Sequence, residues 1–307
     1  MDDRTSTKDI LLAILCNVLW GTPTVFLKEG YRAFGLASSD FSSIWVFGGL
    51  RIFLAGCVLM VISAIRNKGR VLPHKGIRVK VAGLSLLHTT IVYALFFLGV
   101  ASTTGTNATI ITSTNVFAAA FISRLFFKDD AITAKKLIGF ALGFAGILLC
   151  LFDQGAFRAM SKGELMVLVH VVLFALGSTL AKKLNQTEDV LVVASWNYVI
   201  GGGVLVALGL AFGGRLENWN LKGALILAFL VLVSTVCFYL WNSLLLRNNI
   251  SQVGVFQLCN PIVSFTLSVV ILNEASLQAR YIGALALVIA GILVVTLHKG
   301  AKHGKAD

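Results

Sequence analysis

The sequence predicts an all-α membrane protein in which ten transmembrane helices form two inverted five-helix repeats. Of its 307 residues, 57% are hydrophobic and only 13% are charged, whereas soluble domains carry roughly 25% charged residues. The mean hydropathy is +0.86, and the apolar residues come in runs long enough to cross a bilayer as helices. A string of residues from the first half recurs in the second half, which indicates an internal repeat.

The apolar runs predict where the helices lie. We expect spans near residues 10–29, 42–65, 79–101, 104–127, 134–152, 162–183, 190–213, 222–246, 250–273 and 279–298. A spanning helix needs about 20 predominantly apolar residues, and the connections between these runs are short and hold most of the charges. The first run lacks the small-residue cleavage site of a signal peptide, so we expect it to remain as a helix.

The basic residues predict the orientation of the chain. A net charge of +12 could suggest a nucleic-acid partner, but the Lys and Arg residues lie in short loops, where their usual role is to set membrane topology. With the N-terminus in the cytoplasm, most of the 26 Lys and Arg residues fall on cytoplasmic segments. We therefore expect both termini in the cytoplasm, the lipid bilayer as surroundings and no nucleic-acid partner.

The internal repeat relates the two halves of the chain. Ala145–Leu148 and Ala290–Leu293 both read Ala-Gly-Ile-Leu, and the same offset pairs Asn115 with Asn260. Each half holds an odd number of predicted helices, so the second half enters the membrane in the opposite direction. Inverted repeats are frequent in secondary transporters, whose substrate site lies near the bilayer midplane between the halves.

These boundaries divide the chain into four parts. We expect one repeat at 10–152 and the other at 162–298, with cytoplasmic tails at 1–9 and 299–307.

Several of these residues also match a known family. The matching residues are Leu19-Trp20-Gly21-Thr22 and Lys28 in the first span, and Asn260-Pro261, Glu274, Gly283 and Ala290-Gly291 near the C-terminus. This pattern resembles the EamA repeat of the drug/metabolite transporter superfamily, and the resemblance covers both halves. The first half departs from it at Val116, which stands where the second half has Pro261. The resemblance implies ten transmembrane helices, a location in the cytoplasmic (inner) membrane and transport of small metabolites, often export of amino acids.

Arg51 is the most distinctive single residue, because it lies deep in the second span with apolar residues on both sides. Charged groups at such a depth are rare and usually functional. One interpretation is that Arg51 binds a carboxylate or another anion of the substrate. It could instead be a fixed counter-charge bonded to helix carbonyls, or its long side chain could extend to the membrane surface.

Polar residues follow one another along the faces of two predicted helices. In the ninth span, Gln257 and Asn260 begin a polar stripe, and Asn115 is the repeat mate of Asn260. In the eighth span, Tyr239 and Asn242 lie on one face. Such stripes could line a solute path, but small and polar residues also hold membrane helices together. Glycines in the fifth and seventh spans are assigned to close helix packing.

Two histidines lie in the middle of predicted spans, His88 and His170. Histidine titrates near neutral pH and could carry a coupling proton, although a neutral, hydrogen-bonded core residue is the favoured interpretation of each. The Asp and Glu residues nearest the spans lie at helix ends or in loops: Glu29, Asp40, Asp129, Glu164 and Glu274. Facilitated exchange and proton coupling through histidine therefore both stay open.

Large aromatic residues within the spans could shape an amphiphilic pocket. The candidates are Trp20, Tyr93, Trp196, Tyr198 and Trp241. Trp and Tyr also anchor helices at membrane interfaces, but Trp20 and Trp241 lie deeper than an anchor requires. Aromatic faces can bind cations, which would suit an amine.

Together these patterns predict a secondary transporter that moves small metabolites, amino acids or related amphipathic solutes, by alternating access. Export is what the family resemblance implies, and the direction of net transport stays open. The candidate substrate-binding residues are Trp20, Arg51, His88, Tyr93, Asn115, His170, Tyr239, Trp241, Asn242, Gln257 and Asn260. The sequence holds no HExxH, GxSxG or Walker A motif, so we expect no enzyme activity, cofactor or metal. Amines, sugars or nucleosides as substrates, or a non-transporting receptor or scaffold, stay open, as does the oligomeric state.

Overall fold

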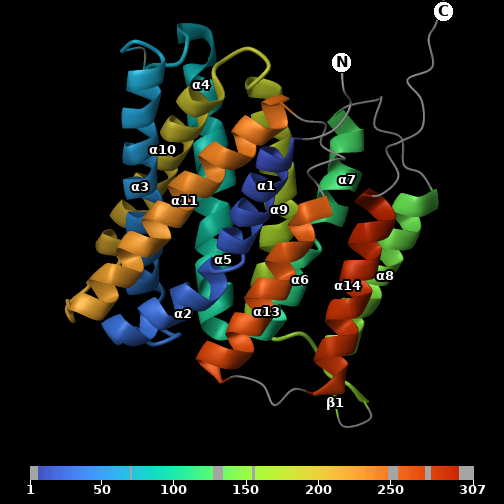
Figure 1. Cartoon of the computed structure of the whole chain (residues 1–307). Coiled ribbons are helices and arrows are strands. Elements are labelled where there is room, and N and C mark those ends of the chain that lie inside the picture. The colour runs from blue at the N-terminus through green and yellow to red at the C-terminus, as the bar shows by residue number, and fades with distance from the viewer. Residues whose placement is uncertain are drawn as a thin grey trace, which may run out of the picture.

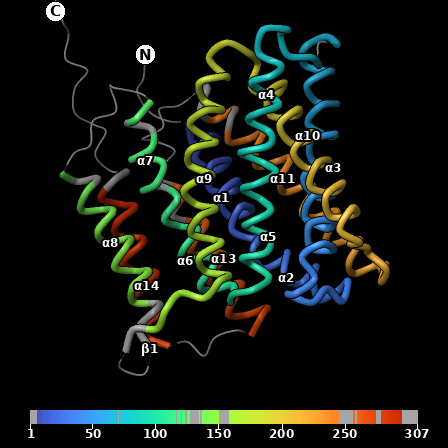
Figure 2. Tube along the Cα trace, turned by 180° about the vertical axis from the view of Figure 1, so that it is seen from behind, coloured from blue at the N-terminus to red at the C-terminus, as the bar shows by residue number. Residues whose placement is uncertain are grey.

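The protein folds as a bundle of helices in the computed structural model, which describes residues 6–69, 71–126, 134–153, 156–247, 255–273 and 278–296. The start of α1 and the end of α14 lie at one end of the bundle, and the short hairpin β1–β2 lies at the other (Figure 1). Seen from behind, α8 and α14 lie at one side of the bundle, and α3 and α10 lie at the opposite side (Figure 2).

Each half of the chain contributes a series of helices. The first half holds α1 (Thr7–Trp20), α2 (Pro23–Phe34), α3 (Phe41–Arg66), η1 (Lys75–Ile77), α4 (Arg78–Leu84), η2 (Ser85–Ile91), α5 (Val92–Ser102), α6 (Gly105–Ser113), α7 (Asn115–Phe126) and α8 (Ala134–Leu151). Two-residue strands β1 (Phe152–Asp153) and β2 (Ala156–Phe157) pair antiparallel. The second half holds α9 (Lys162–Leu184), α10 (Val190–Ala211), α11 (Leu221–Arg247), η3 (Val255–Leu258), α13 (Cys259–Leu272) and α14 (Ala279–Thr296).

These helices make the chain a multi-pass membrane protein. Within the described residues, six helical segments are long and apolar enough to cross a bilayer: Thr7–Phe34, Phe41–Arg66, Lys75–Ser102, Lys162–Leu184, Val190–Ala211 and Leu221–Trp241. Shorter apolar helices cover Leu137–Leu149, Cys259–Leu272 and Ala279–Val294. Every range predicted from the apolar runs contains helix, while the total of ten crossings stays a prediction.

The first span differs from its prediction as one continuous helix over 10–29. It runs from Thr7 to Phe34 and is interrupted at Gly21 and Thr22, which separate α1 from α2. Pro23 occupies the start of α2, where its missing N–H costs nothing because first-turn N–H groups lack helical partners. The hydroxyl of Thr22 donates to the Leu19 carbonyl at 2.8 Å, which satisfies a carbonyl at the end of α1.

The fourth span is also interrupted, although it lacks the proline of the ninth. Thr114 separates α6 from α7, and its hydroxyl donates to the Ile111 carbonyl at 2.6 Å. A hydroxyl that bonds a carbonyl of the preceding turn competes with the helix ladder and bends helices. In the second half, Pro261 lies in the first turn of α13, directly after the 3₁₀ turn η3, so this proline begins a helix and does not kink one.

Glycines allow the longest helices to approach closely, as the sequence predicted. A Cβ atom at Gly202 of α10 would lie 2.5 Å from the Phe53 backbone nitrogen of α3. A Cβ atom at Gly146 of α8 would lie 2.9 Å from the Ala284 carbonyl oxygen of α14. Both positions leave no room for a side chain, so small residues set these two helix interfaces. The largest buried core lies around α3 and α5 and includes Phe47, Phe97 and Leu205.

Candidate functional site

Arg51 lies near the middle of α3 and is only 5% exposed. Its Nε atom donates to the Ser234 hydroxyl of α11 at 3.2 Å, and that hydroxyl donates to the Leu230 carbonyl at 2.7 Å. The Nη1 atom of Arg51 is buried and meets no hydrogen-bond partner among the described residues. Because an unpaired buried cation is costly in a membrane, this atom is available for a polar ligand, and the side chain does not extend to the surface.

Three tyrosines from three helices lie in the neighbourhood of Arg51: Tyr31 of α2, Tyr93 of α5 and Tyr198 of α10. Tyr31 donates to the Phe97 carbonyl at 3.3 Å, and the rings of Tyr93 and Tyr198 lie edge to face with centroids 6.5 Å apart. We call these three tyrosines, Arg51 and Ser234 the Arg51 cluster.

The Arg51 cluster draws side chains from both halves of the chain. A guanidinium presents a fixed fork of donors that suits a carboxylate or another small oxyanion, and phenol hydroxyls can add hydrogen bonds to the same ligand. Sequence reasoning identified Arg51 and considered Tyr93 and Tyr198. It missed Tyr31, which lies beyond the predicted end of the first span, and Ser234, which carries no signal beyond its place in an apolar run.

His88 lies on η2, a stretch of π-helix, and both of its ring nitrogens have partners. Its Nδ1 atom lies 3.2 Å from the Asn197 amide nitrogen, and its Nε2 atom lies 3.3 Å from the Ser178 hydroxyl. The Asn197 amide oxygen accepts a hydrogen bond from Thr89 at 3.0 Å. This network assigns the neutral tautomer with the proton on Nε2, and it joins η2 to α9 and α10.

His170 of α9 lies among aromatic rings and is 8% exposed. Its Nδ1 atom lies 3.0 Å from the Val92 carbonyl oxygen, at the junction where η2 ends and α5 begins. The rings of Phe96 and Phe174 have centroids 4.7 and 5.6 Å from the imidazole. The arrangement is that of a neutral core histidine which satisfies a carbonyl freed by the irregular helix.

Trp20 and Trp241 meet where α1 packs against α11. Their rings lie edge to face with centroids 5.6 Å apart, and both pack against the buried Cys16 and Cys237. Cys237 lies in the neighbourhood of Arg51.

The remaining candidates do not form one lining. Tyr239 packs against the main core. The Asn115 amide oxygen at the start of α7 is buried and has no partner among the described residues. Gln257 lies on η3, and the Asn260 carbonyl oxygen would lie 2.8 Å from a Cβ atom at Gly21, so Asn260 belongs to the contact of α13 with the α1–α2 break. The side chain of Asn242, like Asp129 and Glu274, lies outside the described residues.

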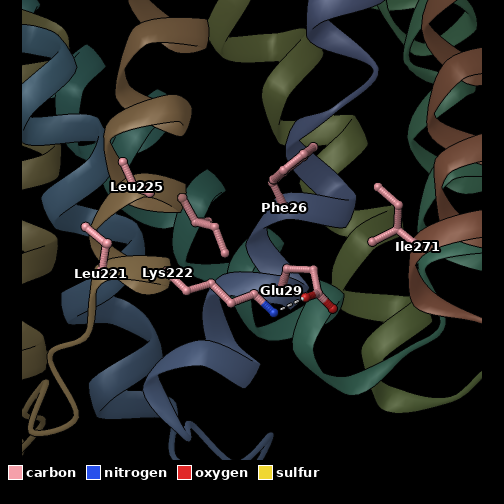
Figure 3. Close-up of a pocket in the computed structure, with 7 residues that line it drawn as sticks. Phe26, Glu29, Leu221, Lys222, Leu225 and Ile271 are labelled. Atoms are coloured by element: carbon pink, nitrogen blue, oxygen red, sulfur yellow. Dashed lines mark hydrogen bonds and ion pairs between the residues drawn. The ribbon is translucent and has the colours of Figure 1, made fainter.

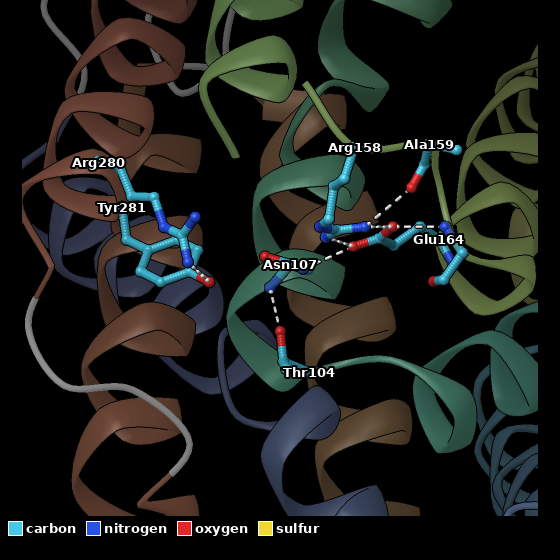
Figure 4. A network of polar contacts seen from close by, with 8 residues as sticks. Thr104, Asn107, Arg158, Ala159, Glu164, Arg280 and Tyr281 are labelled. Carbon is cyan, nitrogen blue, oxygen red and sulfur yellow. Dashed lines mark hydrogen bonds and ion pairs between the residues drawn. The ribbon is translucent and has the colours of Figure 1, made fainter. Parts of the chain in front are cut away.

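A polar network that the sequence did not predict joins α6 to the start of α9 (Figure 4). It follows the β1–β2 hairpin, at the end of the bundle opposite the start of α1 (Figure 1). Glu164 of α9 is 2% exposed. Its carboxylate accepts from the Arg158 guanidinium at 2.8 Å and from the Asn107 amide of α6 at 2.6 Å. It also accepts from the Ser161 N–H at 2.8 Å and completes a capping box. We call Asn107, Arg158 and Glu164 the α6–α9 latch.

Sequence analysis missed the α6–α9 latch because Glu164 lies at the edge of an apolar run. A carboxylate at such a position is usually interpreted as a solvent-exposed helix cap. Only its partners reveal that it is buried. Among the described residues, no group of three or more His, Cys, Asp or Glu side chains is arranged to hold a metal ion.

Comparison with known proteins identifies the family. Residues 7–152 and 161–297 each match the profile of the EamA-like transporter family. The uncharacterized transporter YetK of Bacillus subtilis is 27% identical over 269 residues, which cover 83% of this chain and 79% of YetK. An uncharacterized transporter of Archaeoglobus fulgidus is 24% identical over 297 residues, which cover 95% of this chain and 98% of that protein.

A solved crystal structure shares the fold. It superposes with a TM-score of 0.67 at 17% identity and covers 95% of this chain and 98% of the other. At that identity the likeness concerns the fold alone. The matches to the family profile and to the two relatives confirm the resemblance on which the sequence analysis drew.

Proposed function

The chain belongs to the EamA-like transporter family, and from this premise we propose that it exports amino acids or related amphipathic solutes across the cytoplasmic membrane by alternating access. The observation that carries the substrate class is the buried Nη1 atom of Arg51, which meets no partner among the described residues. A substrate carboxylate would satisfy this donor, and Trp20, Tyr93 and Trp241 would contact the apolar part of the solute.

The pattern of helix contacts supports a mechanism with two exchanging halves. If the halves are inverted repeats, α3 corresponds to α10, α8 to α14 and α6 to α13, and each of these helices packs against its counterpart. The contact of α5 with α9 corresponds to that of α11 with α1. The contact of η2 with α10 corresponds to that of α11 with α3. A two-fold relation of this kind lets the halves rock about a central site.

In such a transport cycle, the α6–α9 latch would hold one end of the helix bundle closed. Asn107 belongs to the first half, Glu164 to the second, and Arg158 to the connection between them. The distribution of Lys and Arg among the loops leads us to place the latch end of the bundle outside the cell and both termini in the cytoplasm. Opening toward the outside would then require that the carboxylate of Glu164 leave the Asn107 amide.

Transport by the purified full chain in proteoliposomes tests this proposal. A panel of radiolabelled amino acids, amines, nucleosides and sugars is offered to wild type, Arg51→Gln and the exposed-site control Arg215→Gln. We expect flux of carboxylate-bearing solutes in wild type and in the control. We expect at least a tenfold loss in Arg51→Gln, since a charge-assisted hydrogen bond contributes about 1.5–3 kcal/mol.

Other outcomes would redirect the proposal. Unchanged flux in folded Arg51→Gln would remove Arg51 from the site. Transport of amines alone would assign substrate binding to Trp20 and Trp241 in place of Arg51. The absence of flux for every solute would favour a receptor over a transporter.

A second measurement tests coupling. Because both His88 nitrogens are hydrogen-bonded in the neutral form, we propose exchange without a coupling proton, so that flux is the same with and without an imposed pH gradient. A gradient that drives accumulation would contradict this part of the proposal.

A further inference from the structure

A groove lies where α2, α11 and α13 meet (Figure 3). Helix α2 and the start of α11 lie toward the end of the bundle that holds the β1–β2 hairpin (Figure 1). Its volume is about 430 Å³, which falls within the roughly 300–1,000 Å³ of small-molecule sites. The lining residues are Phe26 and Glu29 of α2, Leu221, Lys222, Leu225 and Ile226 of α11, and Ile271 of α13. All are apolar except Glu29 and Lys222, so the groove suits an apolar chain with a charged group at one end.

The charged end of the groove presents cations. The Glu29 carboxylate lies 2.9 Å from the Lys222 ammonium and 2.7 Å from the Arg32 guanidinium. Side-chain exposure is 13% for Glu29 but 66% for Lys222 and 53% for Arg32. One shielded carboxylate thus holds two exposed cations together. An ammonium carries three N–H donors and a guanidinium five, so each cation can serve Glu29 and a second anion.

The position of the groove matches the boundary of the membrane. α11 begins at Leu221, and Trp219 just before it is 57% exposed. Exposed tryptophans mark the level of lipid headgroups. From this level the exposed Leu225 side chain (61%) and the apolar lining lead toward the hydrocarbon region.

We propose that this groove binds a glycerophospholipid, with an acyl chain against Phe26, Leu225 and Ile271 and the phosphate on Lys222 and Arg32. The cationic surplus favours an anionic headgroup over a zwitterionic one. A choline or ethanolamine group would find only the Glu29 carboxylate at this rim, and both cations already engage it. The lipid site is separate from the Arg51 cluster and does not depend on the proposed transport activity.

Lipid binding to the full chain can be measured directly. The purified, delipidated protein is titrated with dioleoylphosphatidylglycerol or dioleoylphosphatidylcholine, and bound lipids are counted by native mass spectrometry. We expect wild type to bind the first phosphatidylglycerol more tightly than phosphatidylcholine. The double variant Lys222→Gln/Arg32→Gln should lose roughly tenfold in affinity for phosphatidylglycerol, as expected when charge-assisted hydrogen bonds are removed. Lys75→Gln, in an exposed connection of the first half, is the control and should bind as wild type.

A variant that fills the groove tests the contribution of the acyl chain to binding separately from that of the headgroup. Leu225→Trp changes an exposed side chain, so the fold should persist, and we expect weaker binding of both lipids. Equal affinity for the two lipids, or unchanged binding in the double variant, would overturn the proposal. Competition by soluble glycerol phosphate as strong as that by the lipid would assign a phosphate site in place of a lipid site.

Discussion

At the residue scale, most polar side chains in the apolar helices bond specific partners, whereas a few, Arg51 and Asn115 among them, keep a buried polar atom that meets no partner among the described residues. His88, Thr89 and Asn197 satisfy one another, and such pairing is the rule for buried polar groups. Arg51 keeps a buried donor without a described partner. Together with its buried charge, this unpaired donor is why we propose Arg51 as a binding residue.

Asp40 gives a prediction about pH at the same scale. It caps α3, accepting from the Ser43 N–H at 3.0 Å and the Ser42 hydroxyl at 2.9 Å. Burial alone would raise the pKa of its carboxyl, but these hydrogen bonds outweigh burial and hold the pKa below its usual value. A lowered folded-state pKa stabilises the protein above the unfolded pKa, about 4, and this stabilisation is lost as the pH falls.

Thermal melting at several pH values measures this effect. Asp40→Ala should lower stability at pH 7 by about 0.5–2 kcal/mol, the usual contribution of a helix cap, and the difference should shrink below about pH 4. Asp40→Asn keeps a capping oxygen and should show little loss at neutral pH. A loss in Asp40→Ala that is constant from pH 7 to pH 3 would contradict an ionised cap.

At the element scale, the spans lie close together because glycines face bulky side chains. Gly177 of α9 faces His88: a Cβ atom there would lie 2.3 Å from the imidazole Cδ2 atom. Gly83 of α4 faces nothing within 4 Å. Of these two glycines, only the first is required by packing.

Alanine substitutions at these two positions form a matched pair. Gly177→Ala should push α9 away from η2 and lower stability by about 1–3 kcal/mol, the usual cost of overpacking. Gly83→Ala should be neutral or stabilising by up to about 1 kcal/mol, because alanine favours the helix. Melting temperatures in detergent measure both changes, and equal values for the two variants would show that the close approach at Gly177 is not structurally important.

At the scale of the whole molecule, the two halves begin alike. Ser161 caps α9 three residues before Glu164, and Ser6 caps α1 three residues before Asp9. Both acids are buried, at 2% and 8% exposure. The repeat that pairs Asn115 with Asn260 also pairs Asn107 with Gln252, which lies outside the described residues.

Because the α6–α9 latch lies at one end of the bundle, substitution of Glu164 should act on one side of the membrane. The reporter is Ser234→Cys beside Arg51 in a cysteine-free variant that still transports, labelled with an impermeant maleimide in oriented proteoliposomes. Glu164→Gln should raise labelling from the side on which the latch lies. We expect a rise of roughly tenfold, since one charge-assisted hydrogen bond is lost. Unchanged labelling from that side in Glu164→Gln would refute a closing role of the latch.

Sequence patterns alone determined that this protein spans the membrane with apolar helices, that its halves are related and that Arg51 is exceptional. Those properties are local, because span length, hydropathy and an isolated charge can be read one segment at a time. Tertiary structure decided which polar groups are satisfied. The tyrosines near Arg51 and the burial of Glu164 depend on neighbours far away in the chain. The cost of an unpaired polar group is set by those neighbours, so no window of sequence contains it.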